Sequence, residues 1–151
     1  MRLYLPVTLL DVDSAPSAGS LPAGRAHAVT PALRALFPDE DDEGLEYAAQ
    51  LAAADDSLDR LGAAPAAPRL RVVLAADVDA GVVDAALDDE VPSAVHVREP
   101  VPWSAVVCAH VDEPAAADDV AAALTDDDAM ERLDERDLLW YDRTELGAIP
   151  R

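Results

Sequence analysis

The residues best suited to chemistry lie close together, at a predicted junction between a loop and a helix. Thr30 and Pro31 form a helix-start signal, a hydroxyl at the N-cap followed by proline at the first helical position. Arg25, His27 and Arg34 flank this signal. Free N–H groups, a hydroxyl and two guanidinium groups would form a pocket for a small phosphate or carboxylate. The predicted ligand-binding residues are Arg25, His27, Thr30 and Arg34.

A plainer interpretation accounts for the same residues. The two arginines would pair with the acidic surface of the domain, and Thr30 would only cap the helix. A deep pocket at the junction would favour ligand binding, whereas a flat surface in which acids pair with the arginines would favour this interpretation.

Two histidines form an alternative site. His96 and His110 lie in two segments, 93–99 and 104–111, which are predicted to be strands that pair through a short turn. Pairing would bring the two imidazoles to metal-binding distance, with Asp112 as an oxygen ligand. Histidines on neighbouring strands are more often exposed or hydrogen-bonded. We therefore predict no metal, and keep His96, His110 and Asp112 as the alternative.

No sequence motif specifies a reaction. The chain lacks the H-E-x-x-H, G-x-S-x-G, P-loop and G-x-G-x-x-G patterns. Cys108 is the only cysteine, and in the apolar stretch AVVCAHV a buried thiol acts as a small apolar side chain. Its activation would need a histidine and an electropositive setting, which an acidic chain disfavours. We predict no catalytic residue and no cofactor. The sequence leaves open whether the chain is an enzyme, and favours a non-catalytic role.

Charge is distributed unevenly along the chain. There are 31 acidic and 11 basic residues, all of the latter arginine, for a net charge of -20. Residues 39–62 hold nine acids and residues 112–137 hold eleven, and both segments are predicted to be helical. Such a surface repels nucleic acid and anionic membranes, so we exclude both as partners. It would suit a basic protein partner, although helix capping and genome composition explain much of the charge.

Aromatic side chains are scarce, and three of them are candidates for an interface. Trp140 and Tyr141 alternate across a predicted strand, so one faces the core and the other does not. An exposed aromatic side chain on a terminal strand would mark a homodimer interface, whereas a buried one would anchor an alanine-rich core. The predicted interface residues are Trp103, Trp140 and Tyr141.

Hydrophobic periodicity and turn residues predict the elements that must position these side chains. Strands are expected at residues 2–10, 69–78, 93–99, 104–111 and 137–142. Helices are expected from Pro31 to just before Pro38, from the acidic run at 39–44 to Gly62, and at 79–90, 112–124 and 125–135. Residues 11–29, rich in Ser, Ala, Pro and Gly, are expected to be a long loop, and residues 143–151 a tail.

In the 39–62 helix, one face is predicted to be apolar. Its members follow the helical repeat and are Tyr47, Leu51, Ala54, Leu58 and Leu61, with Asp56 on the opposite face.

The order of elements predicts an α+β fold. Without the short 79–90 helix, the order reads β-α-β-β-α-β, which is the ferredoxin-like arrangement. We therefore expect a single domain over residues 1–151, with a mixed or antiparallel sheet and helices mainly on one face. No apolar run approaches the roughly 18 residues of a membrane-spanning helix, and the N-terminus is predicted to be a first strand rather than a signal peptide. A cytoplasmic location is expected.

Three stretches, MRLYLPVTL, AHAVTPALR and DLLWYD, occur in this order with EYAAQLAAADDSL and RVVLAADV between them. In this the chain resembles an uncharacterised family of small actinobacterial proteins, a domain of unknown function. The resemblance covers most of the chain and implies an actinobacterial source. It implies no activity, cofactor or catalytic residue.

The function therefore stays unknown at the level of sequence. The hypothesis we favour is a non-catalytic interaction or regulatory module, with a homodimer or a basic protein as partner. The alternative is a small anionic-ligand binder or enzyme that uses the 25–34 junction.

Overall fold

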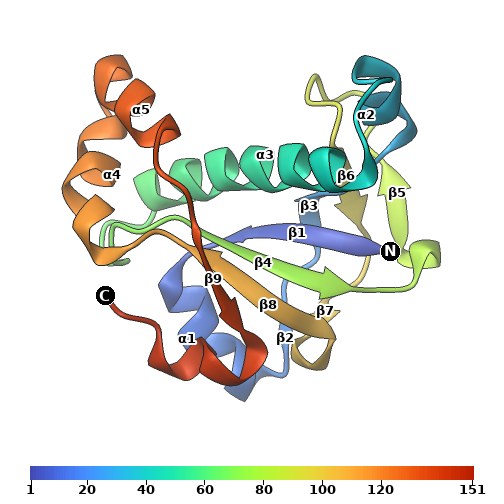
Figure 1. Ribbon diagram of the computed structural model, residues 1–151. Helices are drawn as coiled ribbons and strands as arrows, with labels where there is room; N and C mark the ends of the chain where they lie inside the picture. The colour runs from blue at the N-terminus through green and yellow to red at the C-terminus, as the bar shows by residue number, and fades with distance from the viewer.

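A computed structural model describes residues 1–151 and shows an α+β protein built on one large antiparallel sheet (Figure 1). The sheet has seven strands in the order β5-β6-β3-β1-β4-β8-β9. Their bounds are β1 Arg2–Val7, β3 Gly24–His27, β4 Val72–Asp77, β5 Val83–Ala85, β6 Ala94–Val97, β8 Val106–Val111 and β9 Leu139–Asp142. Two short strands, β2 (Ser20–Leu21) and β7 (Val101–Pro102), pair separately.

The helices are α1 (Leu9–Ala18), α2 (Pro31–Leu36), α3 (Asp42–Gly62), α4 (Ala117–Ala123) and α5 (Asp127–Asp134). Four 3₁₀ turns accompany them: η1 (Ala80–Val82), η2 (Trp103–Ala105), η3 (Pro114–Ala116) and η4 (Arg143–Ala148). No helix combines the length and the apolar character that crossing a membrane requires.

The complete ferredoxin-like topology is not confirmed. β3 and β4 both pair antiparallel with β1 and are therefore parallel to each other, so β3, α3 and β4 form one split βαβ unit around β1. The second half does not repeat this unit, because α4 and α5 connect β8 to β9, which are antiparallel neighbours. β6 also pairs with β3 and β5 rather than with β8. The reason is that the chain between β6 and β8 does not form a hairpin, since β7 pairs with β2.

The prediction of a long loop over residues 11–29 is wrong. Thr8 caps α1 in a capping box with Asp11, and Leu9, Val12 and Ala15 bury one side of the helix. Gly19 ends it at a φ of 82°, in the left-handed region that glycine adopts without strain. The Ser, Ala and Pro content concealed a helix whose capping signals lie at its two ends.

Side chains alternate across the sheet and build two cores. On one side Leu3, Leu5 and Val7 of β1 join the largest apolar cluster, which α1 and η4 cover. On the other side Tyr4 packs beneath α3 with a smaller cluster. Figure 1 shows α3 along one face of the sheet, with α1 and the C-terminal segment on the other.

The predicted range of the α3 helix is confirmed, and its predicted apolar face is confirmed in part. Ala54, Leu58 and Leu61 are buried as expected, whereas Tyr47 and Leu51 are exposed. Ala49 and Ala53 are fully buried instead and pack against the sheet with Tyr4. Alanines let the helix lie close to the strands, so the small residues form the contact stripe. The larger side chains of Tyr47 and Leu51 lie at the border of the helix, where both line a cavity.

Two further predictions are wrong. Residues 79–90 do not form a helix, because η1 is followed directly by the edge strand β5. Residues 143–151 are not a free tail: Leu146 and Ile149 are buried in the larger core through η4. Asp142 caps this turn in a capping box with Glu145. Because η4 is short, no helical repeat in the sequence drew attention to this signal.

Candidate functional site

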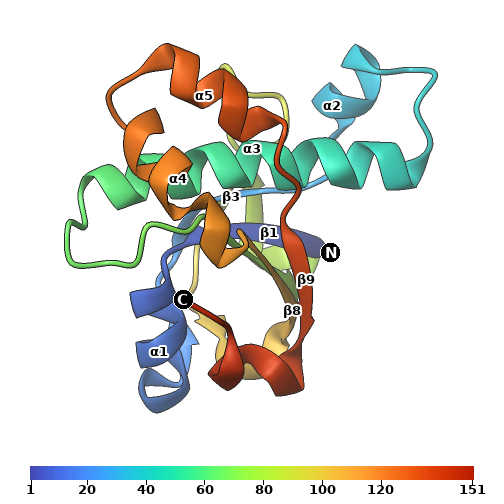
Figure 2. The same ribbon diagram turned by 60° about the vertical axis from the view of Figure 1, so that its left-hand side comes forward.

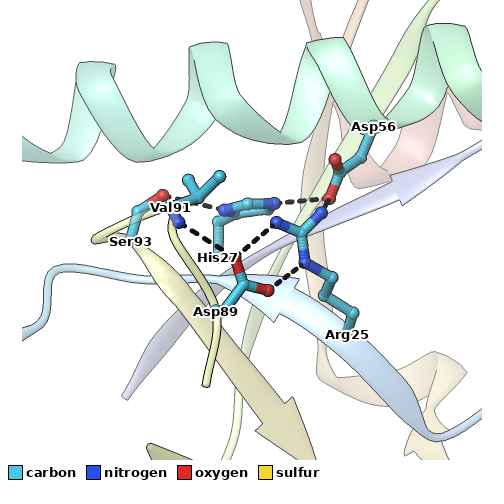
Figure 3. A network of polar contacts seen from close by, with 6 residues as sticks. All are labelled: Arg25, His27, Asp56, Asp89, Val91 and Ser93. Carbon is cyan, nitrogen blue, oxygen red and sulfur yellow. Dashed lines mark hydrogen bonds and ion pairs between the residues drawn. The ribbon is translucent and has the colours of Figure 1, made fainter. Parts of the chain in front are cut away.

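Arg25 and His27 point from β3 toward α3 and meet Asp56 there (Figure 3). Nε2 of His27 lies 2.6 Å from Oδ2 of Asp56, and Nη1 of Arg25 donates to the same oxygen. On its other side Arg25 donates from Nε and Nη2 to the two oxygens of Asp89, at 2.8 and 3.1 Å. Oγ of Ser93 lies 2.8 Å from Nδ1 of His27. We call these five residues the Arg25–His27 network.

The tautomer of the His27 ring follows from its partners. A carboxylate only accepts hydrogen bonds, so Nε2 carries the proton that Asp56 accepts. In the neutral ring Nδ1 then accepts from the hydroxyl of Ser93.

Serine, histidine and aspartate together are the residues of acyl-transfer triads, but burial excludes that role here. His27 is 0% exposed and Ser93 is 1% exposed. None of the larger cavities is lined by either residue. A nucleophile must reach its substrate, so this serine cannot act as one. The network instead joins β3, α3 and the segment before β6 into one unit.

The two carboxylates of the network have pKa values below the ordinary range. Burial alone would raise the pKa of Asp56, but the hydrogen bond from His27 and the charge of Arg25 outweigh it, so this pKa is lowered. The hydrogen bond from Arg25 lowers the pKa of Asp89, helped by the backbone N–H of Val91, which lies 2.9 Å from its carboxylate. Both groups therefore stay ionised at neutral pH.

The four predicted ligand-binding residues do not converge on a cavity. Thr30 caps α2 through the N–H of Leu33 and donates its hydroxyl hydrogen to the carbonyl of Pro92. Arg34 is exposed and pairs with Asp42 at 2.9 Å. With Arg25 held by two carboxylates and His27 buried, ligand binding here stays a prediction, and the acid-paired geometry is that of the plainer interpretation.

Sequence reasoning missed three members of the network: Asp56, Asp89 and Ser93. The helical repeat predicts Asp56 on the face of α3 away from the core, and the other two lie in a segment without a motif. One signal was available. A buried histidine needs an acceptor, and Asp55 and Asp56 are the two acids between the buried Ala54 and Leu58, so this signal narrows the choice to two residues.

The structure separates the residues of the metal alternative. β3, β1 and β4 lie between β6, which carries His96, and β8, which carries His110. Both oxygens of Asp112 accept from the guanidinium of Arg71, each at 2.9 Å, and the ion pair is buried. No group of three or more His, Cys, Asp and Glu side chains is placed to hold a metal ion. The expected pairing of the two histidine strands is therefore wrong.

The three predicted interface residues lie on two sides of the sheet. Trp103 and Tyr141 are half-buried and pack against the larger core. Trp140 points to the α3 side and is 59% exposed. The alternation predicted for Trp140 and Tyr141 is confirmed, whereas their role in an interface stays a prediction.

Trp140 lines a groove between α3 and the C-terminal part of the chain. Two cavities, of about 590 and 470 Å³, share Tyr47 and Gln50 of α3 in their walls and so form one groove. The chain from Asp134 to Trp140 forms the opposite wall, and Figure 2 shows it leaving α5 and passing beside α3 before it joins the sheet as β9. We call this hollow the α3–β9 groove.

The sheet itself supplies the floor of the α3–β9 groove. Tyr4 of β1 is opposite Ala75 of β4, which is in turn opposite Cys108 of β8. Two residues after Cys108 on β8, His110 is opposite Trp140 of β9. Because alternate residues of a strand point to the same face, these side chains form two neighbouring rows beneath the helix.

Three polar side chains line the groove without a strong partner. Tyr4 is 5% exposed, and its hydroxyl forms no hydrogen bond with another residue. Burial raises the pKa of Tyr4 to about 12, so the phenol stays protonated. Gln50 likewise forms no side-chain hydrogen bond, and the nearest polar partner of His110 is the sulfur of Cys108 at 3.9 Å. Every fully buried side-chain nitrogen or oxygen has a hydrogen-bond partner, so these three groups are free because they reach the cavity, where they are available to a ligand.

The Cys108–His110 pair is not arranged as an activated nucleophile. Burial raises the pKa of the Cys108 thiol, which keeps it protonated at neutral pH. Burial, with the nearby charge of Arg2, lowers the pKa of His110, so its imidazole is neutral. A catalytic thiolate requires the opposite shift on the cysteine.

The charges of the groove are unbalanced in a specific way. Each arginine in its walls is already paired with an acid outside the groove: Arg2 with Asp77, Arg71 with Asp112, and Arg136 with Asp119 and Glu113. Six acids in the walls form no ion pair: Asp41, Glu43, Glu46, Asp55, Asp134 and Asp137. The groove therefore presents net negative charge to anything that enters it.

Comparison with known proteins identifies a family. The model of a family of unknown function, DUF6912, matches residues 1–149. Neither the curated proteins nor the solved structures gave a match to this chain.

Proposed function

We propose that this chain, which belongs to the DUF6912 family of unknown function, is a non-catalytic interaction module that binds a partner through the α3–β9 groove. The observation that carries the proposal is the combination of a groove with free polar groups and exposed large apolar side chains beside it. Tyr47, Leu51 and Trp140 are exposed at its border. Exposed aromatic side chains around a hollow are typical of protein-binding surfaces.

The chemistry of the molecule supports binding over catalysis. The Arg25–His27 network is satisfied internally and closed to substrate, and the thiol of Cys108 is held in its unreactive form. What the groove does offer is hydrogen-bonding capacity and apolar surface in one place. These are properties of a recognition site.

The composition also supports a setting for this module. Arginine without lysine and a single cysteine fit the actinobacterial source and the cytoplasmic location that we infer.

Affinity capture with matched variants tests the proposal. The wild-type chain, a Tyr47→Ala/Trp140→Ala variant and a Leu87→Ala control would be immobilised and exposed to extract of the source organism. Leu87 is 91% exposed and lies far from the groove in the sheet order, so it controls for the loss of an exposed apolar side chain. We expect a protein that the wild type and the control retain and the double variant loses. Retention by all three would contradict the proposal.

A further inference from the structure

We propose that the α3–β9 groove takes a basic segment of a partner protein, with an arginine or lysine side chain inserted between Trp140 and Tyr4. This inference rests on the proposed function and names the chemistry of the partner. Its first support is charge complementarity. Six unpaired acids line the groove, while each arginine in its walls is neutralised by an acid that lies outside it.

The second support is independent of the acids. Tyr4 as a whole residue is more than nine-tenths buried and lines the larger cavity, and its hydroxyl has no hydrogen-bond partner in the protein. No fully buried side-chain oxygen lacks a partner, so this hydroxyl is reached from the cavity. A protonated phenol still has oxygen lone pairs that accept a hydrogen bond from a guanidinium or an ammonium group. The fold has therefore placed an acceptor on the floor of the groove and left it unused.

Aromatic rings provide the third support. Trp140 and Tyr47 both line the cavity that contains Tyr4, from the strand side and the helix side respectively. A cation over the face of a tryptophan or tyrosine ring is attracted by the ring quadrupole, most strongly when it is desolvated. Glu46 lies in the same cavity and would supply the counter-charge.

Arg2 is the one feature of this cavity that opposes a cation. Its guanidinium donates from Nε and Nη2 to the two oxygens of Asp77, at 2.6 and 3.1 Å, so its charge is largely cancelled. Asp41, Glu43 and Glu46 line the same cavity and outnumber it. The cavity remains negative with Arg2 included.

The net charge argues against a second copy of this chain as the occupant. Two molecules that each carry a net charge of -20 repel each other, and association would bring that charge together. A basic partner does not meet this repulsion, and the negative charge of the groove attracts it as it approaches.

Peptide selection on the whole protein tests the inference. A phage-displayed library of random peptides would be selected on the immobilised chain at physiological ionic strength. The enriched peptide would be titrated beside a version in which glutamine replaces every arginine and lysine. We expect enrichment of basic sequences, and a loss of affinity of about tenfold or more for the glutamine version.

Variants place the binding in the groove. Trp140→Ala should weaken binding of the enriched peptide about tenfold, and Tyr4→Phe and Glu46→Gln about threefold each. Glu131→Gln removes an exposed acid of α5 that lines neither cavity and should leave affinity unchanged. Thermal unfolding of each variant confirms that it is folded, and the conservative Tyr4→Phe and Glu46→Gln changes keep the test valid if Trp140→Ala is not.

Each outcome separates the two proposals. Enriched peptides that bind the groove but carry no cation would overturn this inference and leave the interaction module standing. Basic peptides that lose as much affinity in Glu131→Gln as in Glu46→Gln would show general electrostatic attraction and would also overturn it. Absence of any groove-dependent binding, by peptide or by captured protein, would overturn the proposed function itself.

Discussion

At the scale of single residues, Asp56 joins the α3 helix to the sheet by polar contacts with two side chains. One of its oxygens accepts from both Arg25 and His27, which lie on β3. Removal of a carboxylate of this kind leaves a fully buried imidazole N–H without an acceptor.

We therefore expect Asp56→Ala to lower the free energy of unfolding by about 2–3 kcal/mol, measured by urea denaturation. Asp59→Ala is the matched control, because Asp59 is an exposed acid on the same helix with no ion-pair partner. Its change should stay within about 0.5 kcal/mol. Equal losses in the two variants would show that the network contributes nothing.

The pH dependence of stability is a second residue-scale prediction. The pKa of Asp56 is lowered in the folded state from an ordinary value of 3.8. A lowered carboxyl pKa contributes stability that is present above the unfolded value and is lost as pH falls through the folded pKa. The difference in free energy of unfolding between the wild type and Asp56→Asn should therefore be constant near neutral pH and shrink below pH 3.8.

Effects that the two proteins share cancel in this comparison. Acidification also relieves the repulsion among the many other acids, but that effect is shared by the two proteins and cancels in the difference. A difference that stays constant down to the acid unfolding transition would contradict the assignment.

At the scale of elements, the C-terminal segment is part of the core. Leu146 is 4% exposed and packs, through η4, into the cluster beneath the sheet. Leu146→Ala should lower the free energy of unfolding by about 2–4 kcal/mol, because it removes a buried side chain and leaves a cavity. In Leu87→Ala, where the side chain is exposed, denaturant titration should detect almost no change. A small effect at Leu146 would mean that the segment is detached in solution.

The range of an element was easier to predict from the sequence than its packing. The range of α3 was predictable, because the acidic run that caps it and the helical repeat are local. Its buried face was predictable only in part: Ala54, Leu58 and Leu61 are buried as expected, but packing against the sheet favours Ala49 and Ala53 over the larger Tyr47 and Leu51. Strand order was not predictable either, because the pairing of β7 with β2 is a tertiary choice that diverts the chain from a hairpin.

In the candidate site, too, local features were predictable and long-range contacts were not. Arg25 and His27 were identified from their types and their place beside a helix start. Their partners Asp56 and Ser93 lie 29 and 66 residues further along from His27, beyond any local pattern. The groove could not be predicted at all, because its floor combines side chains of β1, β8 and β9 that only the sheet register brings together.

At the scale of the whole molecule, the net charge of -20 should weaken the fold at low ionic strength. Salt screens the repulsion between distant exposed charges. The Debye length of the solution falls from about 30 Å at an ionic strength of about 10 mM to about 10 Å at about 100 mM. We expect the melting temperature to rise over this range, followed by circular dichroism. A fall would mean that the surface ion pairs outweigh the repulsion.

Chemical-shift mapping of a bound partner on the isotopically labelled chain tests whether the α3–β9 groove is the binding site. With a captured protein or an enriched basic peptide, we predict shifts concentrated on the two walls and the floor of the groove. These are residues 2–4, 41–55, 108–110 and 134–140. Shifts centred instead on residues 25–34 and 89–93 would show that the partner binds at the Arg25–His27 network and not in the groove.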